Sequence, residues 1–187
     1  MVALGEAEQS SPVNYRLPVD KEDRFPNLRV HGYAVTSDES PRYNCVGWAA
    51  QGDKTIWWQA KDDPSDPFYW PDDVLTNGTL EAYIELFESL GYEKCLTGNR
   101  SVEIAQEKVA LYAYPDGKFA HVAYQLYYGW TSKLGGWDDI WHRTLEALEC
   151  PLYGEVQCVM KRECRLRGFL ARACFGIVST AWPLKRK

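Results

Sequence analysis

The clearest periodic pattern in the chain lies between Thr79 and Gly91. Apolar residues recur there three and four positions apart, at Leu80, Tyr83, Ile84, Phe87 and Leu90. This spacing places all five on one face of a helix. Thr79 suits the N-cap position, and Gly91 can adopt the left-handed conformation that ends many helices. The pattern predicts an amphipathic helix whose apolar face is buried.

The middle of the chain has the pattern of a β-hairpin. Residues 108–114 and 119–126 are rich in apolar and aromatic residues, and the segment 115–118 between them is Pro-Asp-Gly-Lys, a typical turn sequence. We expect two antiparallel strands joined by this turn. Further short strands are predicted at residues 28–36, 131–134 and 153–160, and a short helix is predicted around residues 145–148.

These elements predict one α+β domain with a segment on either side. Residues 1–27 show no helical or strand period and contain well-spaced prolines at Pro12, Pro18 and Pro26, which predicts an extended N-terminal segment. Residues 28–160 form the predicted domain. Residues 161–187 form a basic C-terminal segment that is expected to pack on the domain or extend from it.

A second, shorter helix is predicted to begin at Cys45. The turn-forming segment 37–41 leads into Tyr43 and Asn44, and Gly52 can end the helix after about Ala50. A cysteine in the first turn of a helix lies near unpaired N–H groups, which favour the nucleophilic thiolate. The alternative is that Cys45 is a buried small apolar residue.

Charge is divided unevenly along the chain. Residues 1–160 carry 13 Lys and Arg against 25 Asp and Glu, a net charge of −12, whereas residues 161–187 carry 8 Lys and Arg against one Glu, a net charge of +7. The acidic body argues against general nucleic-acid binding, and the basic segment is expected to contact the acidic body.

The chain has neither a secretory signal at its N-terminus nor an apolar run of membrane-spanning length. We therefore expect a cytoplasmic protein without membrane contact. Its six cysteines are expected to be free thiols, and the spacing of Cys150, Cys158, Cys164 and Cys174 lacks the paired arrangement of a zinc site. No metal or other cofactor is predicted.

The order of chemical groups favours a thiol hydrolase. Cys45 precedes His121, which lies 76 residues later near the start of a predicted strand. In a thiol hydrolase, a histidine accepts the thiol proton, a third polar group orients the imidazole, and a backbone N–H at the helix start stabilises the oxyanion. Each of these roles has a candidate in this chain.

The segments Asn44–Ala49 and His121–Ala123 resemble the Cys and His boxes of the CHAP and NlpC-like branches of the papain-like superfamily. Those branches consist mainly of amidases and peptidases that act on peptidoglycan. A closer similarity, over roughly residues 28–160, is to a family of small, mostly bacterial proteins, through the segments 43–49, 108–112, 130–135 and 139–142. The resemblance implies a papain-like α+β fold in which an N-terminal helix bearing the cysteine packs on a small antiparallel sheet.

By this resemblance Cys45 is the nucleophile and His121 the base. The third position offers Thr131 and Ser132, and Ser132 is the candidate, although a hydroxyl orients an imidazole less strongly than a carboxylate or an amide does. Substitutes that folding could bring near are Gln125, Asp139 and His142. His142 has a structural alternative, as a residue at a helix start that bonds the 132–134 segment.

Aromatic residues supply candidate walls for a binding cleft. Trp57-Trp58 and residues 68–71 flank an acidic, proline-bearing loop, and an aromatic minicore under that loop is the alternative reading. The residues predicted to contact a substrate are Asn44, Trp48, Trp58, Trp70, Trp130, Lys133 and His142.

Two functions are consistent with these features. The first is a cysteine-dependent hydrolase or transferase of the amidase or peptidase kind. The second is a catalytically inactive papain-like module that binds a peptide or protein partner through an aromatic groove. Ser132 in the orienting position favours the second function, and the oligomeric state is not indicated by the sequence.

Overall fold

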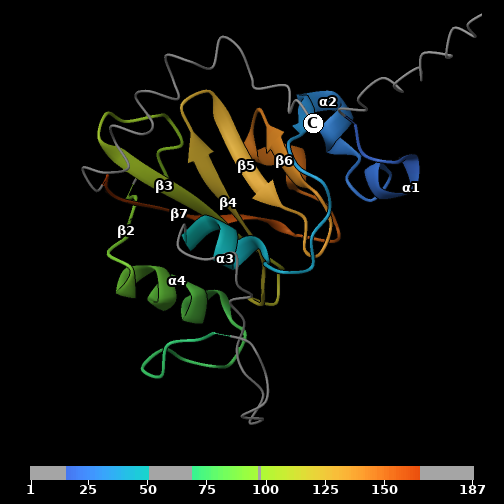
Figure 1. Ribbon diagram of the computed structural model, residues 1–187. Helices are drawn as coiled ribbons and strands as arrows, with labels where there is room; N and C mark the ends of the chain where they lie inside the picture. Colours follow the sequence, from blue (N-terminus) through green and yellow to red (C-terminus); the bar gives the residue numbers. More distant parts are fainter. Residues whose placement is uncertain (1–15, 51–68, 97, 165–187) are drawn as a thin grey trace, which may run out of the picture.

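The computed structural model describes residues 16–50, 69–96 and 98–164. Within them the chain forms one seven-stranded antiparallel sheet and a few short helices, an α+β architecture (Figure 1). The strand order across the sheet is β1-β6-β5-β4-β3-β7-β2. The strands are β1 (Tyr33–Val35), β2 (Glu93–Lys94), β3 (Gln106–Ala113), β4 (Phe119–Leu126), β5 (Gly129–Lys133), β6 (Asp139–His142) and β7 (Glu155–Glu163).

The predicted hairpin forms the centre of the sheet. Strands β3 and β4 pair directly, and β7 pairs along the other edge of β3. The strand predicted at 153–160 corresponds to β7, which extends to Glu163 and so includes the first residues of the basic segment. Residues 139–142, for which no strand was predicted, form β6 between β5 and β1, and the short helix predicted around 145–148 follows them as the 3-10 helix η1.

The N-terminal region differs from its prediction. Helices α1 (Val19–Glu22) and α2 (Asn27–His31) replace part of the expected extended segment, and the predicted strand at 28–36 is shortened to β1. Each helix begins directly after a proline, Pro18 or Pro26. Proline lacks an N–H group, but the N–H groups at the start of a helix have no partner within the helix. Proline is therefore compatible with a helix start, and these two prolines precede helices instead of excluding them.

The predicted amphipathic helix is present as α4 (Leu80–Ser89). The side chain of Thr79 caps it by accepting a hydrogen bond from the N–H of Ala82 at 3.4 Å. The predicted apolar stripe packs into one core cluster, in which Tyr83, Ile84 and Phe87 are buried and Leu80 and Leu90 are partly buried. The spacing in the sequence therefore identified the buried face of this helix correctly.

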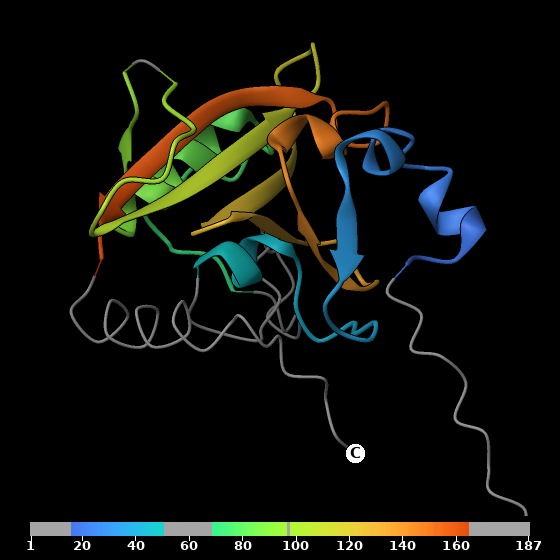
Figure 2. The ribbon, with the colours of Figure 1, turned by 90° about the horizontal axis from the view of Figure 1, so that it is seen from above.

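The sheet has two faces, each with its own apolar core. The α3 face is covered by helix α3 (Cys45–Ala50) and α4, and its strand residues include Leu111, Val122 and Tyr124. The η1 face is covered by α2 and the 3-10 helix η1 (Leu145–Leu148), and its strand residues include Tyr112, Ala123, Trp130 and Ile140. Figure 2 shows α3 and the α2–η1 pair on different sides of the strands.

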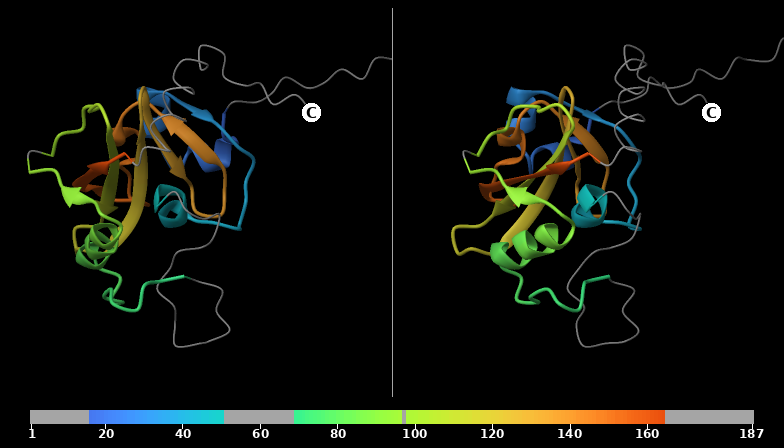
Figure 3. Two further views of the ribbon diagram at one scale, coloured as in Figure 1. Left: turned by 60° about the vertical axis from the view of Figure 1, so that its left-hand side comes forward. Right: turned by 90° about the vertical axis from the view of Figure 1, so that its left-hand side faces the viewer.

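The helices also occupy opposite ends of the sheet. Helix α4 lies beside β3, whereas α1 and α2 lie toward β1 and β6, as the side views show (Figure 3). Among the residues that the structure describes, no helix is long and apolar enough to cross a membrane.

A β-bulge at the start of β4 decides which face each of its side chains meets. Ala113 pairs with Phe119, but the next residue of β3, Tyr112, pairs with His121, so Ala120 is an extra residue. An extra residue reverses the alternation of side chains along the strand. Phe119 therefore packs on Tyr83 of α4, with ring centroids 3.5 Å apart, whereas His121 lies on the η1 face.

Candidate functional site

Cys45 occupies the first position of helix α3, as the sequence predicted. Asn44 is the residue before it and caps the helix, since its side-chain oxygen accepts a hydrogen bond from the N–H of Gly47 at 3.0 Å. The carbonyl of Asn44 accepts the first helical hydrogen bond, from Trp48, also at 3.0 Å. Asn44 was predicted to bind substrate, but its side-chain oxygen serves the helix end.

The thiol of Cys45 lies inside the protein. The residue is 6% exposed, and burial raises the pKa of the thiol to about 11. Neighbouring backbone groups, including that of Val122, and the charge of Lys133 favour the thiolate, but burial outweighs them in setting this pKa. Cys45 is therefore a neutral thiol at neutral pH, and the predicted activated thiolate is not what this environment produces.

His121 does not pair with Cys45. Its side chain is fully buried on the η1 face, and among the described residues neither ring nitrogen has a hydrogen-bond partner. The imidazole stacks on Tyr153 with ring centroids 4.1 Å apart and planes 4° apart, and it meets the edge of Tyr112. Burial lowers its pKa well below 6.5, so His121 is a neutral ring between tyrosines.

Ser132 is bonded to a different histidine from the one expected. Its hydroxyl lies 3.0 Å from Nε2 of His142, and Nδ1 of His142 lies 2.7 Å from the carbonyl of Thr144. Because a carbonyl only accepts, Nδ1 carries the proton and Ser132 donates to Nε2. Both residues are fully buried, and burial lowers the pKa of His142 to about 4. The bond to Ser132 matches the structural alternative for His142, although His142 ends strand β6 and does not start a helix, and the bond leaves His121 without Ser132 as an orienting group.

The predicted aromatic wall is not one surface. Trp130 is buried on the η1 face, whereas Trp48 stacks on Tyr43 on the α3 face, with centroids 5.8 Å apart. Trp70 packs on the edge of Tyr83 and donates to the carbonyl of Val74. Trp58 lies outside the described residues. Trp130 lies on β5 with its side chain on the η1 face, so strand alternation separates it from Trp48 and Trp70.

A cluster of charged and aromatic side chains lies on the α3 face beside Cys45. Lys133 and Asp139 face each other on β5 and β6, with Nζ 4.0 Å from Oδ1, and both are buried. The hydroxyl of Tyr43 donates to Oδ2 of Asp139 at 2.6 Å, and the ammonium of Lys133 lies 4.9 Å from the centre of the Tyr43 ring. Lys133 also donates to the carbonyl of Trp137.

The surroundings of Tyr43 and Lys133 shift the pKa values of both side chains. Burial and the bonded carboxylate raise the pKa of Tyr43 to about 12, so the phenol remains a hydrogen-bond donor. Burial lowers the pKa of Lys133, although Asp139 opposes this by favouring the ammonium. The cluster therefore presents a buried ion pair with a neutral phenol bonded to its carboxylate.

Three buried polar atoms in and beside this cluster have no hydrogen-bond partner within the described part of the chain. They are Oδ1 of Asp139 and the indole Nε1 atoms of Trp48 and Trp141. Trp141 follows Asp139 by two residues on β6, so both side chains project to the α3 face. We refer to Tyr43, Trp48, Lys133, Asp139 and Trp141 as the Lys133–Asp139 cluster.

The sequence identified this cluster only in part. Trp48 and Lys133 were predicted to bind substrate, and Asp139 was a possible third residue, but Tyr43 and Trp141 were not singled out. All five lie in the segments 43–49, 130–135 and 139–142 that carry the resemblance to a family. The sequence of these segments contains all five residues, but only the pairing of β5 with β6 shows that they lie together.

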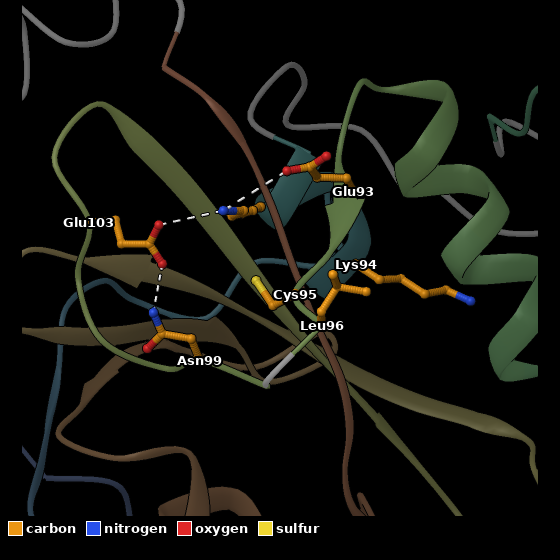
Figure 4. Close-up of a pocket in the computed structure, with 7 residues that line it drawn as sticks. Glu93, Lys94, Cys95, Leu96, Asn99 and Glu103 are labelled. Carbon is orange, nitrogen blue, oxygen red and sulfur yellow. Dashed lines mark hydrogen bonds and ion pairs between the residues drawn. The ribbon is translucent and has the colours of Figure 1, made fainter.

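A separate cavity of about 460 Å³ opens beside edge strand β2 and contains Cys95 (Figure 4). Three of its charged groups, Glu93, Glu103 and Lys161, already engage one another. Lys161 lies 3.9 Å from Glu93 and 3.6 Å from Glu103, and Glu103 also accepts from Lys108 and Asn99. The buried ammonium of Lys108 bonds two loop carbonyls as well, so these groups anchor the loop before β3.

No group of three or more metal-binding side chains occurs in the described ranges 16–50, 69–96 and 98–164. The searches of curated proteins and of solved structures found no match to the chain. One family model matches residues 34–161, which include most of β1, Cys45, the Lys133–Asp139 cluster and most of β7. The chain therefore belongs to the family described as Domain of unknown function (DUF7689).

Proposed function

We propose that this chain is a non-catalytic module with a variant papain-like fold that binds a peptide or protein partner. The observation that carries the proposal is the state of Cys45, a buried thiol whose pKa is raised to about 11. A thiol hydrolase needs a thiolate paired with an imidazole, and its histidine must reach the sulfur. The burial of the Cys45 thiol and the position of His121 on the other face of the sheet support the proposal, because both oppose these conditions.

A side-chain rotation cannot restore the pair. His121 lies on the η1 face of β4, whereas its neighbour Val122 packs in the same core as Cys45. Side chains of adjacent strand residues point to opposite faces, so the imidazole would have to pass through the sheet. Only a change of strand register at the bulge would bring His121 to the α3 face.

Binding is favoured by what the α3 face presents. Trp48 and Trp141 are half-buried, so part of each indole reaches the surface, and tryptophan is enriched at the centres of protein interfaces. The exposed part of each ring can pack against the apolar side chains of a partner. A peptide supplies both apolar side chains and hydrogen-bonding groups.

Alkylation of Cys45 as a function of pH tests the proposal. Iodoacetamide reacts with the thiolate, and mass spectrometry resolves Cys45 from the other cysteines. We expect slow labelling of Cys45 at pH 6, behind partly exposed Cys95, and superimposable pH profiles for the wild type and His121→Ala. Preferential labelling of Cys45 at pH 6 that is lost in His121→Ala would restore the hydrolase.

A further inference from the structure

We propose that the cavity beside β2 is a site of mixed-disulfide formation. Cys95 is the reacting thiol, and its partner is a small disulfide that carries both carboxylate and ammonium groups. This inference goes beyond the proposed function, which concerns Cys45 and the α3 face. It depends on the position of the Cys95 thiol, on the charges around it and on the space beside it.

The thiol faces the cavity from the surface that β2 and β7 form. Cys95 directly follows β2, and its N–H donates to the carbonyl of Val159 on β7 at 2.8 Å. Val159 lies in the core of the η1 face, and Cys95 packs against the same core. Glu93, two residues before Cys95, and its strand partner Lys161 project from this face as well. Cys95 is only partly buried and lines the cavity, so a reagent in the cavity can reach its sulfur.

The charged groups of the cavity suit a ligand that carries both kinds of charge. The ammonium of Lys161 lies 3.9 Å from Glu93 and 3.6 Å from Glu103, which is longer than a hydrogen bond. Its N–H groups can therefore still donate to a carboxylate of a ligand. The side chain of Glu93 is 75% exposed and can accept from an ammonium group. Small thiols of the amino-acid and peptide kind carry both of these groups.

The surroundings of Cys95 also favour a reagent with negative charge. Burial raises the pKa of the thiol, Lys108 and Lys161 oppose this shift, and Glu103 and Glu93 add to it. Each lysine has a larger effect on this pKa than either glutamate, so the positive groups dominate the field at the sulfur. Cys95 reacts through its thiolate fraction, which increases with pH.

The cavity has room for the group that the reaction adds. Its volume of about 460 Å³ lies within the range of small-molecule sites, about 300–1,000 Å³. The Cys95 thiolate attacks one sulfur of the disulfide, so that a new S–S bond forms as the old one breaks. The leaving thiolate takes up the proton that Cys95 released. Cys95 is thereby oxidised, and the small disulfide is reduced to one free thiol.

Three small disulfides that differ in charge test the proposal on the full chain. Oxidised glutathione carries carboxylate and ammonium groups, cystamine carries only ammonium groups, and 2-hydroxyethyl disulfide is uncharged. Exchange at each cysteine is followed by mass spectrometry at pH 8, and each rate is divided by the rate of 2-mercaptoethanol with the same disulfide. We expect Cys95 to react first among the cysteines that the structure describes. Its normalised rate should be about tenfold higher with oxidised glutathione than with cystamine.

Single variants locate the charge that selects the disulfide. Lys161→Met keeps the side-chain stem and removes the ammonium group from the cavity. It should slow the exchange of Cys95 with oxidised glutathione several-fold and leave the exchange with 2-hydroxyethyl disulfide unchanged. Lys118→Met is the matched control, because it removes the same charge from the exposed turn between β3 and β4, and it should leave all rates unchanged.

Equal normalised rates of Cys95 with oxidised glutathione and cystamine would overturn the site, as would faster exchange at another described cysteine. A Lys161→Met effect of the same size on charged and uncharged disulfides would also overturn it, since the variant would then act through access to Cys95. None of these outcomes changes the pH profiles of Cys45 alkylation, so the proposed function stands or falls separately.

Discussion

The two faces of the sheet carry the chemical groups of one expected active site in two separate environments. On the α3 face, Cys45 lies beside a buried ion pair, with its charges compensated and a phenol bonded to the carboxylate. On the η1 face, His121 has no hydrogen-bond partner within the described residues, and Ser132 is bonded to His142. The thiol on helix α3 and the imidazole on strand β4 are therefore separated by the sheet and do not form a chemical pair.

The difference between the faces also concerns how buried polar groups are stabilised. On the α3 face, Lys133 and Asp139 compensate each other's charge. Removing one of them should leave the other as an unpaired charge in a low-dielectric interior. The η1 face holds neutral imidazoles that must stay neutral. Folding stability should therefore fall when either charge of the α3 face is removed, and when the imidazoles of the η1 face are protonated.

The largest expected effect is on the α3 face. Asp139→Ala should lower the free energy of unfolding by about 3–5 kcal/mol, because it leaves the Lys133 ammonium buried without its carboxylate. Chemical denaturation measures this change. The double variant Lys133→Met/Asp139→Leu is the control and should lose much less, because no charge remains unpaired; an equally large loss would show that packing, not charge, explains the single variant.

The next effect is a loss of stability in acid that comes from the η1 face. Burial lowers the folded-state pKa of His142 from 6.5 to about 4, and it lowers the pKa of His121 as well. Above pH 6.5 neither state binds the proton. Below it the unfolded chain is protonated first, so stability falls as pH decreases, by about 3 kcal/mol for His142 alone by pH 4.

Urea denaturation between pH 7 and pH 4 checks this pH dependence. Removing one of the two buried imidazoles should reduce the slope, so His121→Phe is compared with the wild type over the same range. A wild-type stability that stays constant from pH 6.5 to pH 4 would contradict the burial of neutral imidazoles on this face.

A smaller effect of opposite sign is expected at His121 itself. His121→Phe should raise the free energy of unfolding at pH 7 by about 1–2 kcal/mol, because phenylalanine keeps the stack on Tyr153 and removes two buried polar atoms without partners. His142→Phe is the matched control and should destabilise, since it breaks the bonds to Ser132 and Thr144. Destabilisation by His121→Phe would indicate that its ring nitrogens have partners.

Local patterns in the sequence predicted the local structure well. The apolar stripe of α4, the β3–β4 hairpin and the helix start at Cys45 each depend on residues that are close in sequence. Apolar spacing, turn residues and capping residues determine the secondary structure over such short distances. The prolines at Pro18 and Pro26 were misread, because a proline is compatible both with an extended segment and with the start of a helix.

The site could not be predicted in the same way. The face that His121 occupies depends on one extra residue, Ala120, opposite β3, and nothing in the segment 119–121 marks the bulge. Without the bulge, His121 would follow Phe119 to the α3 face and lie on the same side as Cys45. The meeting of Tyr43 with Asp139 likewise depends on strand pairing between distant segments.

The separation of thiol and imidazole is tested most directly by titrating His121 itself. Its imidazole resonances are followed by NMR from pH 8 to pH 4, in the wild type and in Cys45→Ala, with His121→Phe to assign the signals. The structure predicts that His121 stays neutral well below pH 6.5 and that Cys45→Ala leaves its titration unchanged. A His121 pKa above 6.5 that falls when Cys45 is removed would show a thiolate–imidazolium pair and would contradict the separation of the two faces.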